Sequence, residues 1–221
     1  LGAGVDAMAL YGQALFAASN VSGLDVEDRA EIAEEMGDVA ELTGEPQTAH
    51  MAYRTARGHL RGRRGDVRIA RLLRKHGYTA EKAGEYAASV RWYRKAMAEA
   101  ALSPFDVGCR SEAARAAVGL AITRTNQGRY ADARAVLEPL LTINASPLEA
   151  TAEAPMYALL ERIAEETGDP RRPEYEAAAI RAYEALGDRR GIGLLRLNVG
   201  LSAANRSEEH TSELQSRQYL V

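Results

Sequence analysis

The sequence predicts an all-α protein, an α-solenoid of stacked helix-turn-helix repeats. The first observation is a set of similar six-residue strings that open with Gly, close with a small residue and start 40 to 44 residues apart: Gly2–Ala7, Gly44–Ala49, Gly84–Ser89 and Gly128–Ala133. The second is the same apolar spacing after each string. Similarity at a period of tens of residues is typical of proteins that bury a continuous core by stacking repeats.

A second helix of each repeat is predicted after the Gly string. In each such helix a small residue is followed four residues later by a large one, and three residues after that by a small residue or Leu. This spacing puts all three residues on one face of the helix. The sets are Ala7/Tyr11/Ala14, Ala49/Tyr53/Ala56, Ser89/Tyr93/Ala96, Ala133/Leu137/Leu140 and Ala179/Tyr183/Leu186. We expect each large residue to pack where two helices approach closely.

A first helix of each repeat is predicted before the Gly string. A small residue, at Gly37, Gly77 or Ala121, lies seven residues before the next turn glycine, and that glycine ends the helix in the left-handed conformation. We expect first helices to line a concave side and second helices a convex side. The helices are predicted at residues 5–19, 27–43, 46–61, 66–83, 86–102, 108–127, 130–143, 149–167, 173–187 and 190–205.

This pattern resembles the tetratricopeptide repeat (TPR) over about residues 1–205. The resemblance rests on the small residue of the first helix, the turn glycine, the Tyr at 86 or 130 two residues after it, and the triplets of the second helix. The period exceeds the usual one of about 34 residues. Pro46 replaces one aromatic residue, Glu161 stands where a small residue is expected, and residues 168–173 look like an insertion. The resemblance implies a groove that binds a protein, a peptide or other domains of the same chain.

Composition excludes several classes of function. The net charge of −3 gives no global case for binding nucleic acid or an anionic membrane. No apolar run approaches the 18 or so residues that span a bilayer. The single cysteine, Cys109, excludes an internal disulfide and suits a reducing compartment. We therefore expect a cytoplasmic bacterial protein whose partners include neither nucleic acid nor membrane.

Both ends of the sequence carry an expectation of their own. Gly2 falls at the turn of a repeat, so we expect the array at residues 1–205 to be truncated at both ends. Residues 206–216 (RSEEHTSELQS) resemble the direct translation of a sequencing adapter, and Ser207 stands where the next turn glycine is due. We expect residues 206–221 to be a non-native tail and assign them no role.

No motif in the sequence predicts catalysis. Residues 58–65 are glycine-rich but lack the Gly-Lys-Ser/Thr of a phosphate-binding loop, and residues 187–193 do not follow a strand. His50, His59, His76 and Cys109 have no metal-ligand spacing. We therefore expect no catalytic, cofactor-binding or metal-binding residue, no cofactor, and no enzyme activity in this segment.

Charge is distributed unevenly, with acids concentrated at residues 27–45 and bases at residues 54–75. One interpretation is complementary charge on neighbouring helices. The other is a bipolar groove with one acidic flank and one basic, aromatic flank, formed by Glu31, Glu34, Asp38 and Glu41 and by Arg71, Arg74, Tyr78 and Lys82. A nucleic-acid interpretation is disfavoured, because the neighbouring acids would repel phosphate.

Some TPR proteins bind chaperone C-termini through a carboxylate clamp of Lys, Asn and Arg. The Asn of that clamp would fall one residue after the small residue of the first helix. Asp38, Tyr78 and Ile122 occupy this position here. We therefore expect no such clamp in this chain.

Two segments, residues 37–56 and 181–201, look like repeats of large bacterial signalling ATPases. That resemblance implies a regulatory scaffold within a multidomain protein that joins an ATPase to an adenylate/guanylate cyclase domain. The alternative is the repeat region of an ATPase-containing transcriptional regulator, or a free-standing TPR adaptor. In each case the expected role is protein interaction or regulation.

Overall fold

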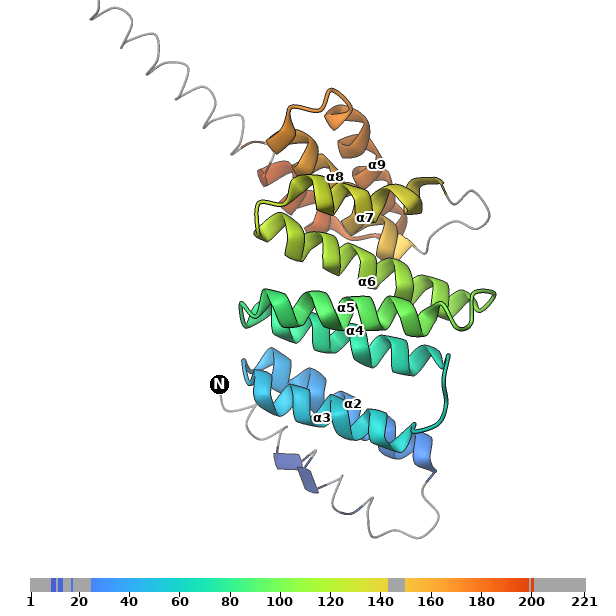
Figure 1. Ribbon diagram of the computed structural model, residues 1–221. Helices are drawn as coiled ribbons and strands as arrows, with labels where there is room; N and C mark the ends of the chain where they lie inside the picture. The colour runs from blue at the N-terminus through green and yellow to red at the C-terminus, as the bar shows by residue number, and fades with distance from the viewer. Residues whose placement is uncertain are drawn as a thin grey trace, which may run out of the picture. The chain divides into compact units, whose positions relative to one another are not determined.

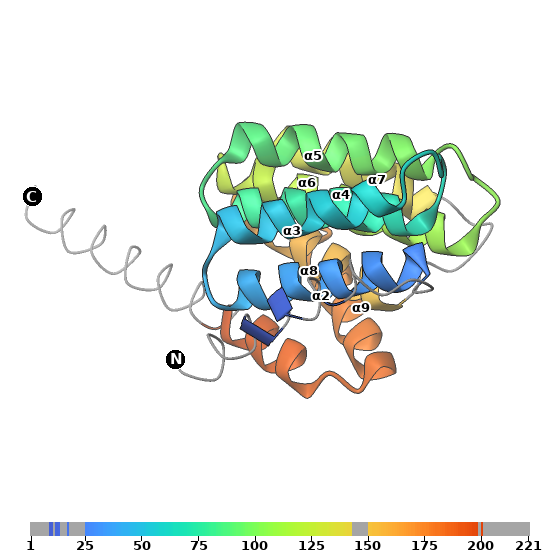
Figure 2. The ribbon, with the colours of Figure 1, turned by 90° about the horizontal axis from the view of Figure 1, so that it is seen from below.

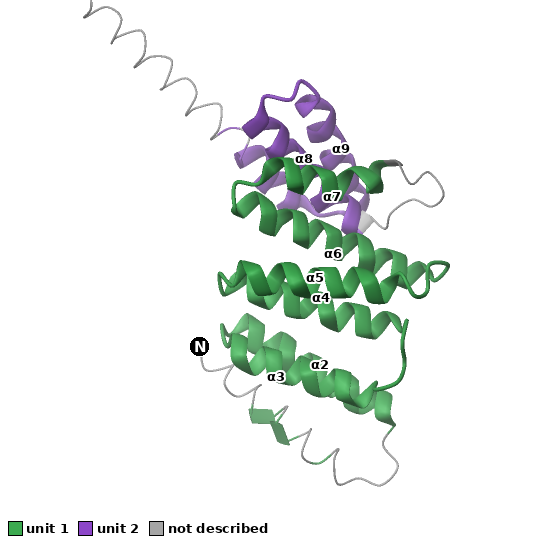
Figure 3. Cartoon of the chain, in the orientation of Figure 1, with its two compact units in different colours: residues 1–146 green, residues 147–221 purple. Residues whose placement is uncertain are grey.

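The computed structural model describes residues 25–142 and 150–198, together with residues 9, 10, 12, 13, 17 and 200. These residues form helices and turns, and no strand occurs among them. The chain divides into two compact units, residues 1–146 and 147–221 (Figure 3). Most of the helix predicted at residues 5–19, and the tail predicted at residues 206–221, lie outside the described residues.

The described part of unit 1 consists of helix pairs stacked in chain order (Figure 1). They are α2 (Val26–Leu42) with α3 (Pro46–His59), α4 (Val67–Lys82) with α5 (Tyr86–Ala100), and α6 (Val107–Asn126) with α7 (Tyr130–Thr142). Figure 2 shows α2, α3, α4 and α5 running along a common direction. Helix α4 packs on α3 and on α6, which joins successive pairs. The all-α repeat fold predicted from the sequence is confirmed.

Each pair turns at a glycine in the left-handed conformation, which glycine enters without strain. The residue after each glycine donates its N–H to a carbonyl five residues upstream. In the first turn, Glu45 N lies 2.8 Å from Ala40 O, so a Schellman motif closes α2. The turn glycines with φ between 68° and 80° are Gly44, Gly84, Gly128, Gly168 and Gly187.

The first helices of unit 1 begin at aspartates. Asp25 and Asp66 accept hydrogen bonds from backbone N–H groups two residues ahead, at 3.3 and 2.9 Å. Asp106 accepts one from Cys109 N at 2.7 Å. A side-chain acceptor at this position satisfies a donor that the helix itself leaves unpaired. The helices labelled α2 to α9 end within two residues of the predicted boundaries.

Two tyrosines fill the space that small residues leave between helices. Tyr53 and Tyr93 are 0% and 2% exposed. A Cβ added to Gly37 would clash with the ring of Tyr53, and one added to Gly77 would lie 2.7 Å from Tyr93 Cδ1. A Cβ on Gly119 of α6 would clash with the ring of Tyr93 as well. The close helix approach predicted from the small and large residues is confirmed.

Unit 2 holds α8 (Ala150–Thr167), α9 (Arg172–Leu186) and a further helical stretch at residues 189–198. Glu161, which replaces the small residue expected on α8, is 2% exposed. Its carboxylate accepts a hydrogen bond from Arg172 Nε at 2.7 Å. Arg172 comes from the segment that looked like an insertion, so the insertion supplies the partner that a buried carboxylate requires.

Candidate functional site

The candidate site of unit 1 is its first-helix face, the face formed by α2, α4 and α6. The groove residues predicted from the sequence all lie on two of these helices. Helix α2 carries Glu31, Glu34, Asp38 and Glu41, and helix α4 carries Arg71, Arg74, Tyr78 and Lys82.

Glu34 is the centre of an ion-pair network between α2 and α4. Its side chain is 9% exposed, with one carboxylate oxygen 2.8 Å from Arg71 Nη2 and the other 2.6 Å from Lys75 Nζ. Lys75 Nζ also lies 2.6 Å from Asp38 Oδ1. Burial alone would raise the pKa of Glu34, but the hydrogen bonds from Arg71 and Lys75 bring the pKa below its ordinary value.

The network has a counterpart between α4 and α6. Arg74 Nε donates to Glu112 Oε2 at 2.7 Å, and Arg115 Nη1 donates to Glu112 Oε1 at 3.1 Å. The Glu112 side chain is only 5% exposed. A buried carboxylate needs a cation and hydrogen bonds, and Glu112 receives them from Arg74 of α4 and from Arg115 of its own helix.

The predicted acidic and basic sets therefore meet directly at part of the face. Glu34 and Asp38 contact cations of α4, while Arg74 turns to an acid of α6. These contacts are those of complementary charge on neighbouring helices, which was one of the two interpretations of the sequence. The bipolar groove stays a prediction, and its remaining members are Glu31, Glu41, Tyr78 and Lys82.

A pocket of about 250 Å³ lies at the turn end of the first-helix face. Glu41 and Lys82 both line it, so the structure brings together one residue of each predicted set. The other lining residues are Gly44, Glu45, Pro46, Thr79 and Ala83.

The side chains around this pocket are held in place. Tyr53 donates its hydroxyl to Asp38 Oδ1 at 2.9 Å and to Glu41 Oε2 at 3.3 Å. Burial raises the pKa of Glu41, and the charge of Asp38 raises it further. Lys82 Nζ lies 5.3 Å from the ring centroid of Tyr78, within the range of a cation–π contact. The pocket lining thus includes a carboxyl, from Glu41, and an ammonium, from Lys82, that also lies over the ring of Tyr78.

A ring stack that sequence reasoning did not anticipate joins α3, α4 and α5. His50 and His76 stack with ring centroids 5.0 Å apart, and their Nδ1 atoms lie 2.7 Å from each other. His76 also stacks on Trp92, at 4.5 Å between centroids. His76 directly precedes Gly77, the small residue of its first helix, so the sequence places it close to the helix contact. A histidine at such a buried position was the one feature of the sequence that could have indicated the ring stack.

Cations lie close to the ring stack, and one acid, Glu85, acts electrostatically on His50 as well. Arg57 lies 5.8 Å and Lys95 4.6 Å from the ring centroid of Trp92. Burial is the main cause that lowers the pKa of His76 to about 3, and His50, Arg57, Arg54 and Lys95 lower it further. His76 is therefore neutral at physiological pH.

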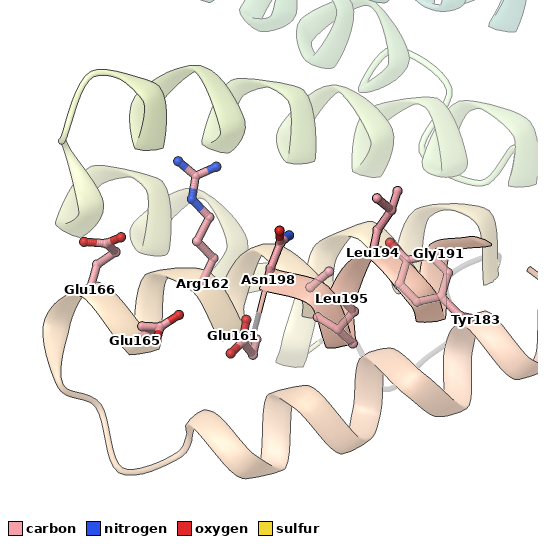
Figure 4. A pocket seen from close by; sticks show the side chains of 10 residues that line it. Glu161, Arg162, Glu165, Glu166, Tyr183, Gly191, Leu194, Leu195 and Asn198 are labelled. Atoms are coloured by element: carbon pink, nitrogen blue, oxygen red, sulfur yellow. The ribbon is translucent and has the colours of Figure 1, made fainter. Parts of the chain in front are cut away.

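Unit 2 contains a second pocket, of about 360 Å³, between α8 and the helical residues 189–198. Figure 4 shows the side chains of Glu161, Arg162 and Glu165 around it, together with those of Leu195 and Asn198. Its lining mixes apolar groups with both signs of charge. Since Glu161 and Glu165 both contact Arg172, its acids belong in part to the internal ion pairs of the unit.

The described residues give no geometry for metal chemistry. No group of three or more His, Cys, Asp or Glu side chains able to hold a metal ion occurs among them. Cys109 is buried, and burial raises the pKa of its thiol to about 11, which disfavours the reactive thiolate. No helix in the described ranges is both long enough and apolar enough to cross a bilayer.

Comparison with protein-family models and with curated proteins finds no match for this chain. Among solved structures, the chain is similar to aspartyl phosphate phosphatase F from Bacillus subtilis, with a TM-score of 0.78 at 14% identity over 94% of this chain. It spans about half of that protein, 53% of its length.

Two further structures are similar to it. BtubC (BKLC) from P. vanneervenii gives a TM-score of 0.64 at 16% identity, covering 90% of this chain and 91% of that one. PilF from Pseudomonas aeruginosa gives 0.51 at 18% identity, covering 81% of this chain and 82% of that one. Phosphatase F and PilF are TPR-like helical repeat proteins, so these likenesses show a TPR-like fold.

Proposed function

We propose that this chain is a scaffold that binds a protein or peptide, or another domain of its own chain, on the first-helix face of unit 1. The observation that carries this proposal is the pocket in which Glu41 and Lys82 meet beside the turn at Gly44. The mixed lining offers a hydrogen-bond acceptor and a donor to an extended segment.

Exposed apolar groups beside the pocket support the same proposal. Leu42 is 86% exposed and Tyr78 is 37% exposed, on the helix ends from which the pocket residues come. Aromatic side chains are enriched at protein interfaces because they bury a large area at a low cost in conformational entropy. A ligand that covers them would gain apolar burial next to a charge-assisted contact.

The ion pairs elsewhere on the first-helix face make this a preorganised surface. Glu34, Asp38 and Glu112 hold their cations through contacts of 2.6 to 2.8 Å. Fewer side chains then have to be ordered when a ligand binds, which lowers the entropic cost of binding. Selectivity would come from Glu41, Glu45 and Lys82 at the pocket.

The pocket can be tested by peptide selection on the full chain. Peptides selected from a random library should bind with micromolar affinity, and Glu41→Lys with Lys82→Glu should weaken them about tenfold or more. A matched swap on α9, Arg181→Glu with Glu184→Lys, also leaves the net charge of the chain unchanged. It should have no effect on the affinity for the selected peptides. Failure to select any peptide, or equal loss in both swaps, would contradict the proposal.

For the wider context, we propose a regulatory segment of a cytoplasmic bacterial signalling protein with ATPase and adenylate/guanylate cyclase domains. The support is the resemblance of residues 37–56 and 181–201 to repeats of such proteins. The alternative is an ATPase-containing transcriptional regulator or a free-standing adaptor. Sequencing the gene through both ends of this chain decides between them, since a phosphate-binding loop together with a cyclase signature is expected only in the first case.

A further inference from the structure

Helices α3 and α5 carry a concentration of positive charge. Both helices are described throughout, and α3 contains no Asp or Glu while α5 contains only Glu99. The Glu99 carboxylate accepts a hydrogen bond from Gly65 N at 2.6 Å, so it is engaged within the fold. The cations on the two helices are Arg54, Arg57, Arg91, Arg94 and Lys95.

Three of these cations gather at one place, around the stack of His50, His76 and Trp92. Arg57 comes from α3 and Lys95 from α5, and both lie within 6 Å of the ring centroid of Trp92. Arg54 of α3 acts electrostatically on both His50 and His76, and Glu85, directly before α5, acts on His50 with the opposite sign. We name Arg54, Arg57, Lys95 and the partly exposed Trp92 the cation–ring cluster.

The cation–ring cluster differs from the basic residues of α4. On α4, Arg68, Arg71, Arg74 and Lys75 each contact a carboxylate. Arg54, Arg57 and Lys95 have no ion-pair partner among the described residues, and Arg54 and Lys95 are exposed. The chain has a net charge of −3, so this positive charge is a local feature, with Glu85 as the acid that acts on the neighbouring His50.

The structure of the cluster favours carboxylates as ligands. The guanidinium groups of Arg54 and Arg57 can each present two parallel N–H donors to a carboxylate, and Lys95 adds a third cation. The ring of Trp92 offers an apolar surface between them. Because His76 is buried and neutral, the rings below the cations add no charge that would need a counterion.

The same geometry disfavours a nucleic acid as the ligand. Sequence-tolerant binding of single strands needs several exposed rings on which bases stack. Here Tyr53, Tyr93 and His76 are at most 2% exposed, which leaves Trp92 and His50 as the partly accessible rings of this group. Exposed acids on α2 of the same unit, Asp28 and Glu31, would also repel a long polyanion.

We propose that the cation–ring cluster on α3 and α5 binds an acidic segment of a partner protein, with carboxylates on Arg54, Arg57 and Lys95 and an apolar side chain on Trp92. This surface is separate from the pocket on the first-helix face. The two proposals can therefore fail independently, and their tests change different residues.

Trp92 is the only tryptophan in the sequence, so its fluorescence reports this site directly. Blocked octaglutamate is titrated into the full chain at low salt. We expect a saturable change in Trp92 emission that weakens steeply as salt is added. The triple variant Arg54→Gln, Arg57→Gln, Lys95→Gln should lose about tenfold or more in affinity.

A matched control removes the same charge elsewhere. Arg189→Gln, Arg190→Gln, Arg196→Gln neutralises three exposed cations in unit 2 and should bind octaglutamate as the unchanged chain does. Equal loss in the two triple variants would overturn the proposal, because it would indicate non-specific charge. An absent or non-saturable fluorescence response would overturn it as well.

Two competing ligands complete the test. Octathymidylate and phosphatidylserine vesicles are compared with octaglutamate at equal concentrations of negative charge. Each is expected to bind at least about tenfold more weakly than octaglutamate. Tighter binding of either one would overturn the assignment to an acidic protein segment. If circular dichroism shows that the triple variant is unfolded, the single variant Lys95→Gln serves instead, with an expected loss of about twofold to threefold.

Discussion

Replacing Gly77 by Ala tests the packing on which the repeat geometry depends. Gly77 lies in α4 and faces the ring of Tyr93, which comes from α5 and is 2% exposed. An added Cβ would lie 2.7, 2.8 and 2.9 Å from three ring carbons of Tyr93. Carbon atoms that are not bonded pack at about 3.5 to 4.0 Å, so one of the two residues has to move.

The ring has little freedom to move away. Gly119 of α6 is so close to the same ring that a Cβ there would clash too. Overpacking of this kind costs about 1–3 kcal/mol. Replacing glycine by alanine inside a helix also gains about 0.5–1 kcal/mol of helix propensity. We therefore expect Gly77→Ala to lower the free energy of unfolding by about 1 kcal/mol, and by at most about 2.5 kcal/mol.

The matched control is Gly58→Ala in α3, where the added Cβ has nothing within 4 Å. Only the propensity gain applies there, so Gly58→Ala should raise stability by about 0.5–1 kcal/mol. Urea unfolding followed by the fluorescence of Trp92, one residue from Tyr93, measures both changes within unit 1. If Gly77→Ala proves as stable as Gly58→Ala, the inferred close approach of α4 and α6 around Tyr93 is wrong.

Two further changes test other parts of unit 1. Ala133 of α7 is 0% exposed, so Ala133→Leu should overpack its helix contact and lower the free energy of unfolding by about 1–3 kcal/mol in the same urea assay. An unchanged unfolding midpoint would contradict the register of the fourth Gly string. Burial and nearby cations lower the pKa of His76 from 6.5 to about 3, so the unfolded chain binds more protons between these values and stability falls as the pH drops. The loss from His76 should reach about 2 kcal/mol at pH 5, and His76→Leu should remove that part of the pH dependence between pH 5 and 7.

Most of the fold could be predicted because the relevant signals are local. A glycine with positive φ and a small residue seven positions before it act within one helix pair. A Tyr among small residues packs within its own pair and, in the case of Tyr93, also against Gly119 of the next first helix. Glu161 was read as a departure from the pattern, and its ion pair with Arg172 shows why the departure is tolerated. That compensation joins α8 to the first residue of α9, and no sequence period encodes it.

The charged residues were harder to predict, because pairing depends on how each helix is rotated about its axis. Spacing places Glu34 and Arg71 on helix faces but does not show that the two faces meet. The structure joins Glu34 to Arg71 and Lys75, and turns Arg74 toward Glu112 on α6. Within the described residues, these contacts separate cations that hold the repeats together from cations that have no partner.

That separation explains why the two proposed surfaces differ in kind. Arg68, Arg71, Arg74 and Lys75 of α4 are already paired, so a ligand of the first-helix face gains mainly at the pocket of Glu41 and Lys82. Arg54, Arg57 and Lys95 form no ion pair with another described residue, so binding at the cation–ring cluster should respond far more strongly to salt. A similar salt dependence at both surfaces would show that the ion pairs of α2, α4 and α6 do not persist in solution.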